Sequence, residues 1–333
     1  MRSYLVTGGS GFIGAPLVRR LLAAGNRVRV FDNHSRGKAS RLADAQGDLE
    51  HLEGDVRDAA AVESAVQGMD AVVHLAFVNG TEFFYTRPEL VLEVGVKGIV
   101  NVLDACRKHH TPEFILASSS EVYQTPPVVP TDETVPLVVP DLWNPRYSYG
   151  AAKIISEVMA VHYGRTGFKR VVIFRPHNVY GPDMGWEHVI PQLVLRMKRL
   201  CEGSSGVVRL PVQGTGRETR AFIYIDDFTE GLLRVIEKGE HLGVYHIGTD
   251  EEVTIRRVAG LIGEYFKRSV DVVPGAGDGH TARGGTPRRC PDIKRLSALG
   301  WKSAVPLHKG VHLTAEWYDR HAELAPVVEG ERV

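Results

Sequence analysis

Cysteine is scarce in this sequence. Its 333 residues include three cysteines, Cys106, Cys201 and Cys290, which are widely spaced and odd in number. This usage suits a reducing compartment better than a disulfide framework, and the spacing matches no zinc motif. We therefore expect neither a disulfide-stapled secreted domain nor a metal site.

The sequence also lacks a net charge and long apolar runs. Lysine plus arginine and aspartate plus glutamate both number 40, so no overall field attracts nucleic acid or an anionic membrane. No apolar run approaches the roughly 18 residues of a membrane span. The chain begins at once with strand-like YLVTG, so we expect no signal peptide. These features predict a soluble, cytoplasmic protein with no nucleic-acid or membrane partner.

Short apolar runs alternate with longer helical patterns over the first 175 residues. The runs that predict strands are SYLVTG, RVRVFD, LEHLEGD, AVVHLAF, EFILASS and RVVIFRP. Strands that alternate with helices imply a parallel sheet covered on both faces, with right-handed connections. We predict an α/β fold: a doubly wound parallel (Rossmann) sheet in residues 1–175, then a smaller C-terminal α/β substrate lobe in residues 176–333, with some crossing between them.

A glycine-rich turn follows the first predicted strand. VTGGSGFIGAPLV places Gly8, Gly11 and Gly14 three residues apart, just before the first helix. Bare backbone there can approach a pyrophosphate at the helix N-terminus. Asp32 ends the second strand, where a carboxylate binds the ribose hydroxyls and repels a 2′-phosphate, so NAD is favoured over NADP. Arg36 follows closely and could instead bind a 2′-phosphate, which keeps NADP as an alternative. Further cofactor contacts are expected from Phe12, Ile13, Asn33, Asp55, Val56, Leu75 and Ala76.

A tyrosine and a lysine stand one helical turn apart in YSYGAAK. Tyr149 and Lys153 are four residues apart and so lie on one face of a helix. A phenol with an ordinary pKa of about 10 is a poor base at neutral pH. A neighbouring ammonium favours the phenolate, which can then take a proton from an alcohol. We predict that this pair is catalytic.

Taken together, the motifs resemble those of the extended short-chain dehydrogenase/reductases. TGGSGFIG, HLA, SSSEVY, YSYGAAK, RPHNVYGP and TRAFIYIDD occur in the order and spacing of that superfamily, and the chain looks like its nucleotide-sugar enzymes. The resemblance implies a tightly held NAD, Tyr149 as base, Lys153 on the nicotinamide ribose, and Ser119 sharing the sugar hydroxyl. It also implies a homodimer formed through helices around 88–108 and 147–165.

The resemblance also assigns residues after the sixth strand. Pro176 and His177 would lie beside the nicotinamide. Arginines from two loops suit phosphate oxygens, although solvated loop arginines are the alternative. The residues expected to bind a nucleotide-diphosphate sugar are Asn178, Val189, Gln192, Arg220 and Arg289.

The stretch ASSSEVYQ bears on which reaction follows. In enzymes of this kind a sugar hydroxyl, usually the one at C4, is first oxidised to a ketone. Simple epimerisation of this keto sugar then needs no further acid or base. The dehydratases that this stretch resembles use the residue at Glu121 as base, decarboxylases often share the Ser-Glu pair, and epimerases more commonly carry a small residue there. Ser120 stands where many dehydratases have an acid. We thus predict catalytic roles for Ser119, Ser120 and Glu121.

The leading prediction is an NAD-dependent nucleotide-sugar epimerase, because epimerases are numerous and the acid at 120 is absent. The alternative is a 4,6-dehydratase or a uronic-acid decarboxylase that uses Glu121. A non-catalytic NAD-binding regulator is a further alternative, against which the intact Tyr149 and Lys153 argue. Three residues depart from the pattern of the superfamily: Gly95 replaces an asparagine, Gln124 a glycine, and Phe77 a small residue, which narrows the expected site.

Overall fold

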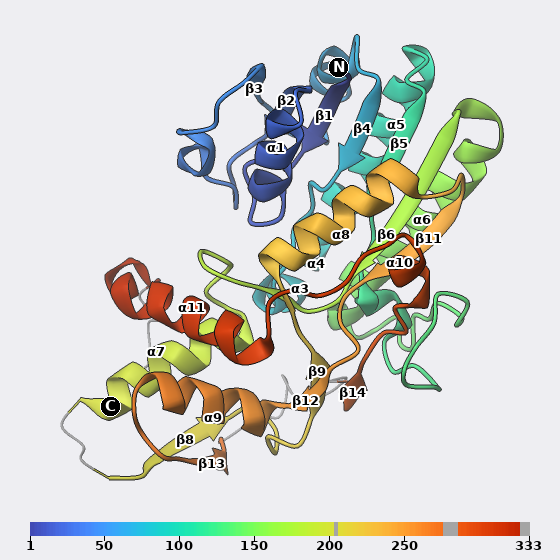
Figure 1. Ribbon diagram of the computed structural model, residues 1–333. Coiled ribbons are helices and arrows are strands. Elements are labelled where there is room, and N and C mark those ends of the chain that lie inside the picture. The colour runs from blue at the N-terminus through green and yellow to red at the C-terminus, as the bar shows by residue number, and fades with distance from the viewer. Residues whose placement is uncertain (203–205, 276–285, 327–333) are drawn as a thin grey trace.

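A seven-stranded parallel sheet forms the centre of the protein (Figure 1). The computed structural model describes residues 1–202, 206–275 and 286–326. The strand order is β11-β6-β5-β4-β1-β2-β3, and each neighbouring pair is parallel. The strands are β1 Ser3–Thr7, β2 Arg27–Asp32, β3 Leu49–Glu53, β4 Ala71–His74, β5 Glu113–Ala117, β6 Arg170–Pro176 and β11 Gly243–Ile247. The doubly wound α/β prediction is confirmed.

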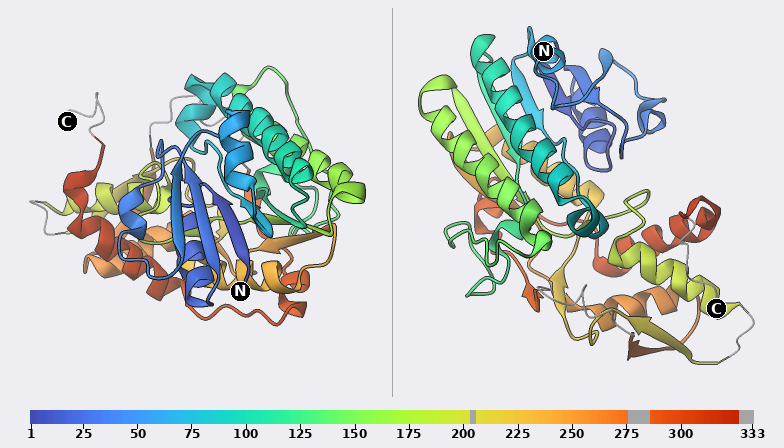
Figure 2. Two further views of the ribbon diagram at one scale, coloured as in Figure 1. Left: turned by 90° about the horizontal axis from the view of Figure 1, so that it is seen from above. Right: turned by 180° about the vertical axis from the view of Figure 1, so that it is seen from behind.

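Helices cover both faces of this sheet because its strands are apolar on both sides. In β1, Tyr4 and Val6 join one buried cluster, whereas Leu5 joins the cluster on the opposite face. The first face carries α1 (Gly14–Ala23) and α8 (Ile225–Lys238). The other carries α2 (Ala59–Val66), α5 (Gly98–Lys108) and α6 (Ser148–Gly167); teal α5 and green α6 run side by side in the right view of Figure 2.

A second, smaller group of elements lies beyond the carboxyl ends of the strands (Figure 1). These elements include α7 Val189–Cys201, α9 Ile255–Tyr265, α11 Leu307–Arg320, β8 Val208–Val212 and β13 Val270–Pro274. Two helices, α7 and α9, pack on the two-stranded parallel pair of β8 and β13, and α11 packs against both helices. Nearby lie the pair β7 (Val179–Tyr180) and β10 (Ile223–Tyr224), and the small sheet of β9 (Thr219–Ala221), β12 (Glu252–Thr254) and β14 (Arg288–Arg289).

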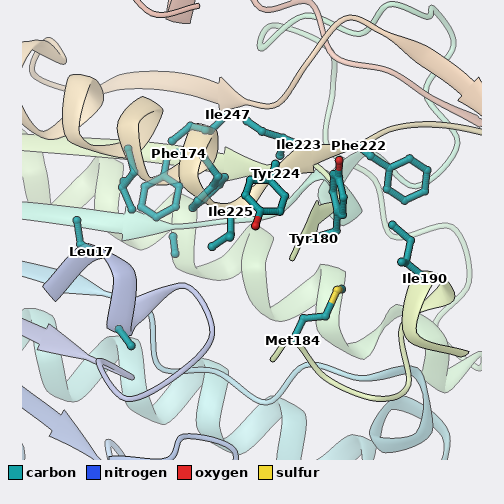
Figure 3. Packing of buried hydrophobic residues seen from close by; sticks show 14 of the residues in the cluster. Leu17, Phe174, Tyr180, Met184, Ile190, Phe222, Ile223, Tyr224, Ile225 and Ile247 are labelled. Carbon is teal, nitrogen blue, oxygen red and sulfur yellow. The ribbon is translucent and has the colours of Figure 1, made fainter. Parts of the chain in front are cut away.

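The two parts share one apolar core. Figure 3 shows Tyr180, Phe222 and Tyr224 packed between the sheet residue Phe174 and Ile190 of α7. The chain also crosses between the parts, because α8 and β11 return from the second half of the sequence to complete the large sheet. No helix in the described ranges is long and apolar enough to cross a membrane.

Short elements connect these layers and several of them border the site. They are η1 Ala39–Leu42, α3 Thr81–Thr86, α4 Pro88–Leu92, the π-helix η2 Glu93–Lys97, η3 Ser120–Tyr123, η4 Pro145–Tyr147, α10 Lys294–Ala298 and η5 Ala322–Leu324.

Candidate active site

A cleft of about 680 Å³ opens where the strands of the large sheet end. Parallel sheets bind their ligands at this edge, because the loops after the strands converge there. Of the residues predicted from sequence, those that line the cleft are Gly8, Gly11, Phe12, Ile13, Gly14, Asp32, Asn33, Arg36, Asp55, Val56, Leu75, Ala76, Ser119, Ser120, Glu121, Tyr149, Lys153, Pro176, Asn178 and Arg289. Four others, His177, Val189, Gln192 and Arg220, are not part of its lining.

His177 is buried behind the cleft instead. Its ring lies 4.6 Å from that of His246, and neither ring nitrogen has a hydrogen-bond partner within the described residues. Burial holds its pKa well below the ordinary value, with His246 adding to the effect. Of the other three, Val189 begins α7 and Gln192 is exposed on it, whereas Arg220 donates to the carbonyl of Thr219 at 2.7 Å.

The glycine turn leaves bare backbone against the cleft. Gly8 has a φ of +70°, and a Cβ on it would lie 2.8 Å from the amide nitrogen of Ala76. A Cβ on Gly14 would lie 2.3 Å from the carbonyl oxygen of Gly8. Side chains are therefore excluded from both positions. The N-terminus of α1 begins here, so the turn fits the pyrophosphate of a dinucleotide.

Acidic side chains stand where the adenosine of such a dinucleotide would lie. Asp32 is 7% exposed and accepts hydrogen bonds from the amides of Ser10 at 3.0 Å and His34 at 2.9 Å. Those amides fix the carboxylate at the end of β2. Asp55 is held by Arg57 at 2.8 Å, which lowers the pKa of its carboxyl to about 2. Both positions fit the ribose and adenine of NAD.

The predicted catalytic phenol is buried in an aromatic setting. Tyr149 packs edge-on against Phe77, with ring centroids 5.0 Å apart, and is stacked on Phe84 at 5.1 Å. Burial raises the pKa of Tyr149 to about 12, against the lowering effect of a hydrogen bond with Ser119. The phenol therefore needs a nearby cation before it can act as a base near neutral pH.

Lys153 supplies that cation from the next turn of α6. Its Nζ donates to the carbonyl of Ala117, at the end of β5, at 2.7 Å. Burial lowers the pKa of Lys153 to about 7, with Glu157 opposing the shift. The ammonium is thus poised to change its charge near neutral pH, which suits a group that tunes a phenol.

Glu121 meets an arginine from a distant loop. Arg289 donates to its carboxylate at 2.5 Å and also donates to Thr286 at 2.9 Å. Burial raises the pKa of the Glu121 carboxyl, but the guanidinium groups of Arg289, Arg146 and Arg220 outweigh that effect, so the pKa lies below its ordinary value. The carboxylate is ionised and bound at neutral pH.

The backbone around Glu121 is held in an unusual conformation. Gln124 has a φ of +52°. Its side-chain amide donates to the Glu121 carbonyl at 2.6 Å, and its own carbonyl accepts from Thr286 at 2.7 Å. These bonds offset the cost of a positive φ for a residue with a Cβ.

Several residues of the site were not singled out from the sequence. Arg146, Phe83, Phe84 and Ser118 line the cleft. Behind it Arg175 donates to Glu157 at 2.6 Å, and Glu157 is one further helical turn beyond Lys153. That spacing was a signal visible in the sequence. Among the described residues no group of three metal-ligating side chains occurs.

The chain is similar to known proteins over most of its length. Residues 4–248 match the NAD dependent epimerase/dehydratase family. A dTDP-glucose 4,6-dehydratase from Streptomyces antibioticus is 31% identical over 94% of this chain and 91% of that protein. UDP-glucuronic acid decarboxylase 2 from Arabidopsis thaliana is also 31% identical, over 93% of this chain and 66% of that protein.

Solved structures show the same fold. A dTDP-glucose 4,6-dehydratase from Streptomyces venezuelae with NAD bound has a TM-score of 0.83 and 29% identity, covering 97% of this chain and 98% of that one. A UDP-glucose 4-epimerase from Thermus thermophilus, in complex with NAD, has a TM-score of 0.81 and 27% identity, over 95% of this chain and 98% of that one.

Proposed function

Because the chain belongs to the NAD-dependent epimerase/dehydratase family, we propose that it is a nucleotide-sugar epimerase that works through a transient 4-keto sugar. Its cofactor is NAD, which fits the bare glycine turn and the carboxylate of Asp32. When bound, NAD supplies a reversible hydride acceptor. The substrate, the carbon that is inverted and the roles below are parts of the proposal.

Tyr149 takes the proton from the sugar hydroxyl. Ser119 shares that hydroxyl, as its hydrogen bond with the phenol suggests. When protonated, the amine of Lys153, whose Nζ lies 5.8 Å from the centroid of the phenol ring, favours the phenolate. In the reverse half of the reaction, Tyr149 returns the proton to the carbonyl oxygen.

Two arginines of the cleft lining, Arg146 and Arg289, hold the anionic part of the substrate, and Arg220 adds positive charge from outside the lining. Arg289 is 7% exposed, and its Nε has no partner within the described residues. Burial, with Arg289 nearby, lowers the pKa of Arg220 to about 10, so two like charges stand close together. Arg146 lines the same cleft. A diphosphate would neutralise this cluster and satisfy its donors.

The ion pair between Glu121 and Arg289 is the observation that favours epimerisation over dehydration. Dehydration needs a base that removes the C5 proton and an acid that protonates the leaving C6 hydroxyl. Glu121 is a weak base while Arg289 binds it, because its pKa is lowered. Ser120 is not an acid. Epimerisation at C4 requires neither group, since the ketone only has to present its other face.

Decarboxylation of a uronic acid is the second candidate. The guanidinium groups of Arg146, Arg220 and Arg289 act on Glu121, and Glu218 also acts on Arg220. Three cations therefore face two carboxylates, which leaves positive charge for a C6 carboxylate. Loss of carbon dioxide next to a ketone needs no base to remove a proton. The same cluster therefore suits a sugar acid as well as a diphosphate.

Chromatographic separation of the sugar isomers, followed by mass spectrometry of the products formed in D₂O, separates these reactions. The protein is incubated with UDP-, GDP- and dTDP-hexoses and with the corresponding uronic acids. The proposal predicts a new isomer of unchanged mass without deuterium at carbon. One deuterium in an otherwise isomeric product would place the inversion at a carbon next to the ketone. Loss of water or of carbon dioxide would overturn epimerisation in favour of dehydration or decarboxylation.

A Glu121→Gln variant gives a second test, with Glu89→Gln on the exposed face of α4 as its control. Epimerisation at C4 should survive in both variants, within about tenfold of the parent. A reaction that uses Glu121 as base should fall by about 10²-fold or more in the first variant alone.

We also propose that the protein is a cytoplasmic homodimer. Ile155 and Val158 are 40% and 52% exposed on α6, and Leu92 is exposed on α4. Exposed aliphatic side chains on neighbouring helices suit a helical interface. Analytical ultracentrifugation would show a monomer mass if this proposal were wrong.

A further inference from the structure

The ring of Phe77 lies directly on the two predicted catalytic side chains. Phe77 follows β4 and lines the cleft. The Nζ of Lys153 is 3.9 Å from its ring centroid, and the ring of Tyr149 meets it at 82°. An ammonium over an aromatic face is attracted to it, and the attraction grows as water is excluded.

Gly95 provides the space for this ring. It lies in the π-helix η2, between α4 and α5. A Cβ on Gly95 would be 2.5 Å from Cζ of Phe77 and 2.8 Å from Cβ of Ala152. No side chain fits at position 95 while Phe77 keeps its place. π-Helical turns are often found at functional sites.

We propose that Phe77 is a positioning residue of the active site, whose ring holds the Lys153 ammonium beside Tyr149 in space left free by Gly95. The inference deepens the proposed function and rests on the roles given there to Tyr149 and Lys153. Phe77 acts by positioning Tyr149 and Lys153 and does not itself contact the reacting atoms.

Few charged groups compete with the ring for Lys153. Tyr149 and Glu157 face it from its own helix, and His74 faces it from β4. Burial lowers the pKa of His74 to about 3, so this histidine is neutral. Since burial disfavours the ammonium, it depends on three supports: the carbonyl of Ala117, the face of Phe77 and the charge of Glu157.

The test compares the wild type with Phe77→Leu, which keeps apolar bulk but removes the π face. Lysine labelled with ¹³C at Cε reports the titration of Lys153 by NMR in the protein without cofactor, and Lys153→Met identifies the signal. We expect the midpoint to fall by about one pH unit in Phe77→Leu. Phe168→Leu, at the far end of α6 where Phe168 packs on Phe114, should leave it unchanged.

Turnover supplies a second readout. In Phe77→Leu the phenolate loses part of its support, so we expect kcat to fall about tenfold at neutral pH and the rising limb of the pH–rate profile to move to higher pH. KM should change little, because Phe77 does not hold the diphosphate. An unaltered Lys153 titration and an unaltered profile in Phe77→Leu would overturn the proposal.

Gly95→Ala reaches the same ring from the other side and covers a failure of Phe77→Leu to fold. Its Cβ must displace Phe77, so the Lys153 midpoint should again fall; no change would count against the proposal. The NMR measurement needs no substrate. If no nucleotide sugar reacts but the midpoint shifts as expected, the proposed function fails while the role of Phe77 stands.

Discussion

Arg289 donates to the carboxylate of Glu121 at 2.5 Å, although the two residues are 168 positions apart in the sequence. The arginine side chain is 8% exposed and that of Glu121 25%. The contact joins the loop after β5 to strand β14 of the smaller part. The carboxylate of Glu121, which bears on the choice between epimerisation and dehydration, is thus bound by Arg289, a residue proposed to bind the substrate diphosphate.

Breaking this pair from one side should destabilise the protein. Arg289→Met leaves the Glu121 carboxylate without its partner, at a cost of about 3 kcal/mol in the free energy of unfolding, the low end for a buried pair because Glu121 is partly exposed. Glu121→Gln combined with Arg289→Met should recover most of that loss. Urea unfolding of the two variants measures both effects, and a double variant no more stable than Arg289→Met would contradict the coupling.

Removing the hydroxyl of Tyr149 should greatly reduce turnover but leave the folded structure unchanged. Tyr149→Phe loses the proton acceptor, so turnover should fall by about 10²–10⁴-fold. Its affinity for NAD, measured by titration calorimetry, should stay within a few-fold of the parent. Tyr147→Phe, two residues earlier and outside the cleft lining, is the matched control. Equal activity of the two variants would remove Tyr149 from the mechanism.

Burial of the protonated Lys153 should reduce the free energy of unfolding, and most strongly at low pH. Its pKa is about 7 in the native protein and near 10.5 when unperturbed. Between those values the unfolded chain binds the extra proton, so this group makes stability rise with pH. Below pH 7 the cost of the buried ammonium is complete, on the order of 5 kcal/mol.

Lys153→Met should therefore stabilise the protein without cofactor, more at pH 6 than at pH 9, while abolishing turnover. The lost hydrogen bond to Ala117 offsets about 1 kcal/mol of the gain. Other titrating groups are common to both proteins and cancel in the difference. Urea unfolding at the two pH values gives the result, and an equal change at both would contradict the shifted pKa.

Asp32 should decide between the two nicotinamide cofactors. Asp32→Asn removes a charged acceptor from the ribose, so affinity for NAD should fall about 10- to 100-fold. The same change removes repulsion of a 2′-phosphate, so the preference for NAD over NADP should shrink. Calorimetric titration with both cofactors measures this. Asp48→Asn, on the surface, is the control, and an undiminished preference in Asp32→Asn would contradict the assignment.

The sequence alone was sufficient for features that depend on neighbouring residues. The alternation of strands and helices predicted the doubly wound sheet, since each pattern is set by burial on one or both faces of a local element. The glycine turn and the Tyr149–Lys153 pair could be predicted for a similar reason. Residues at fixed spacing in a glycine-rich turn, or four residues apart in a helix, have a known relative geometry.

Other features required the tertiary structure, because they join segments that no local pattern connects. β11 returns to the edge of the large sheet, His177 turns away from the cleft toward His246, and Arg289 reaches Glu121. The fit of Phe77 into the space at Gly95 is of the same kind. Periodicity specifies which face of an element is buried, whereas side-chain partners across the core depend on how all the elements pack together.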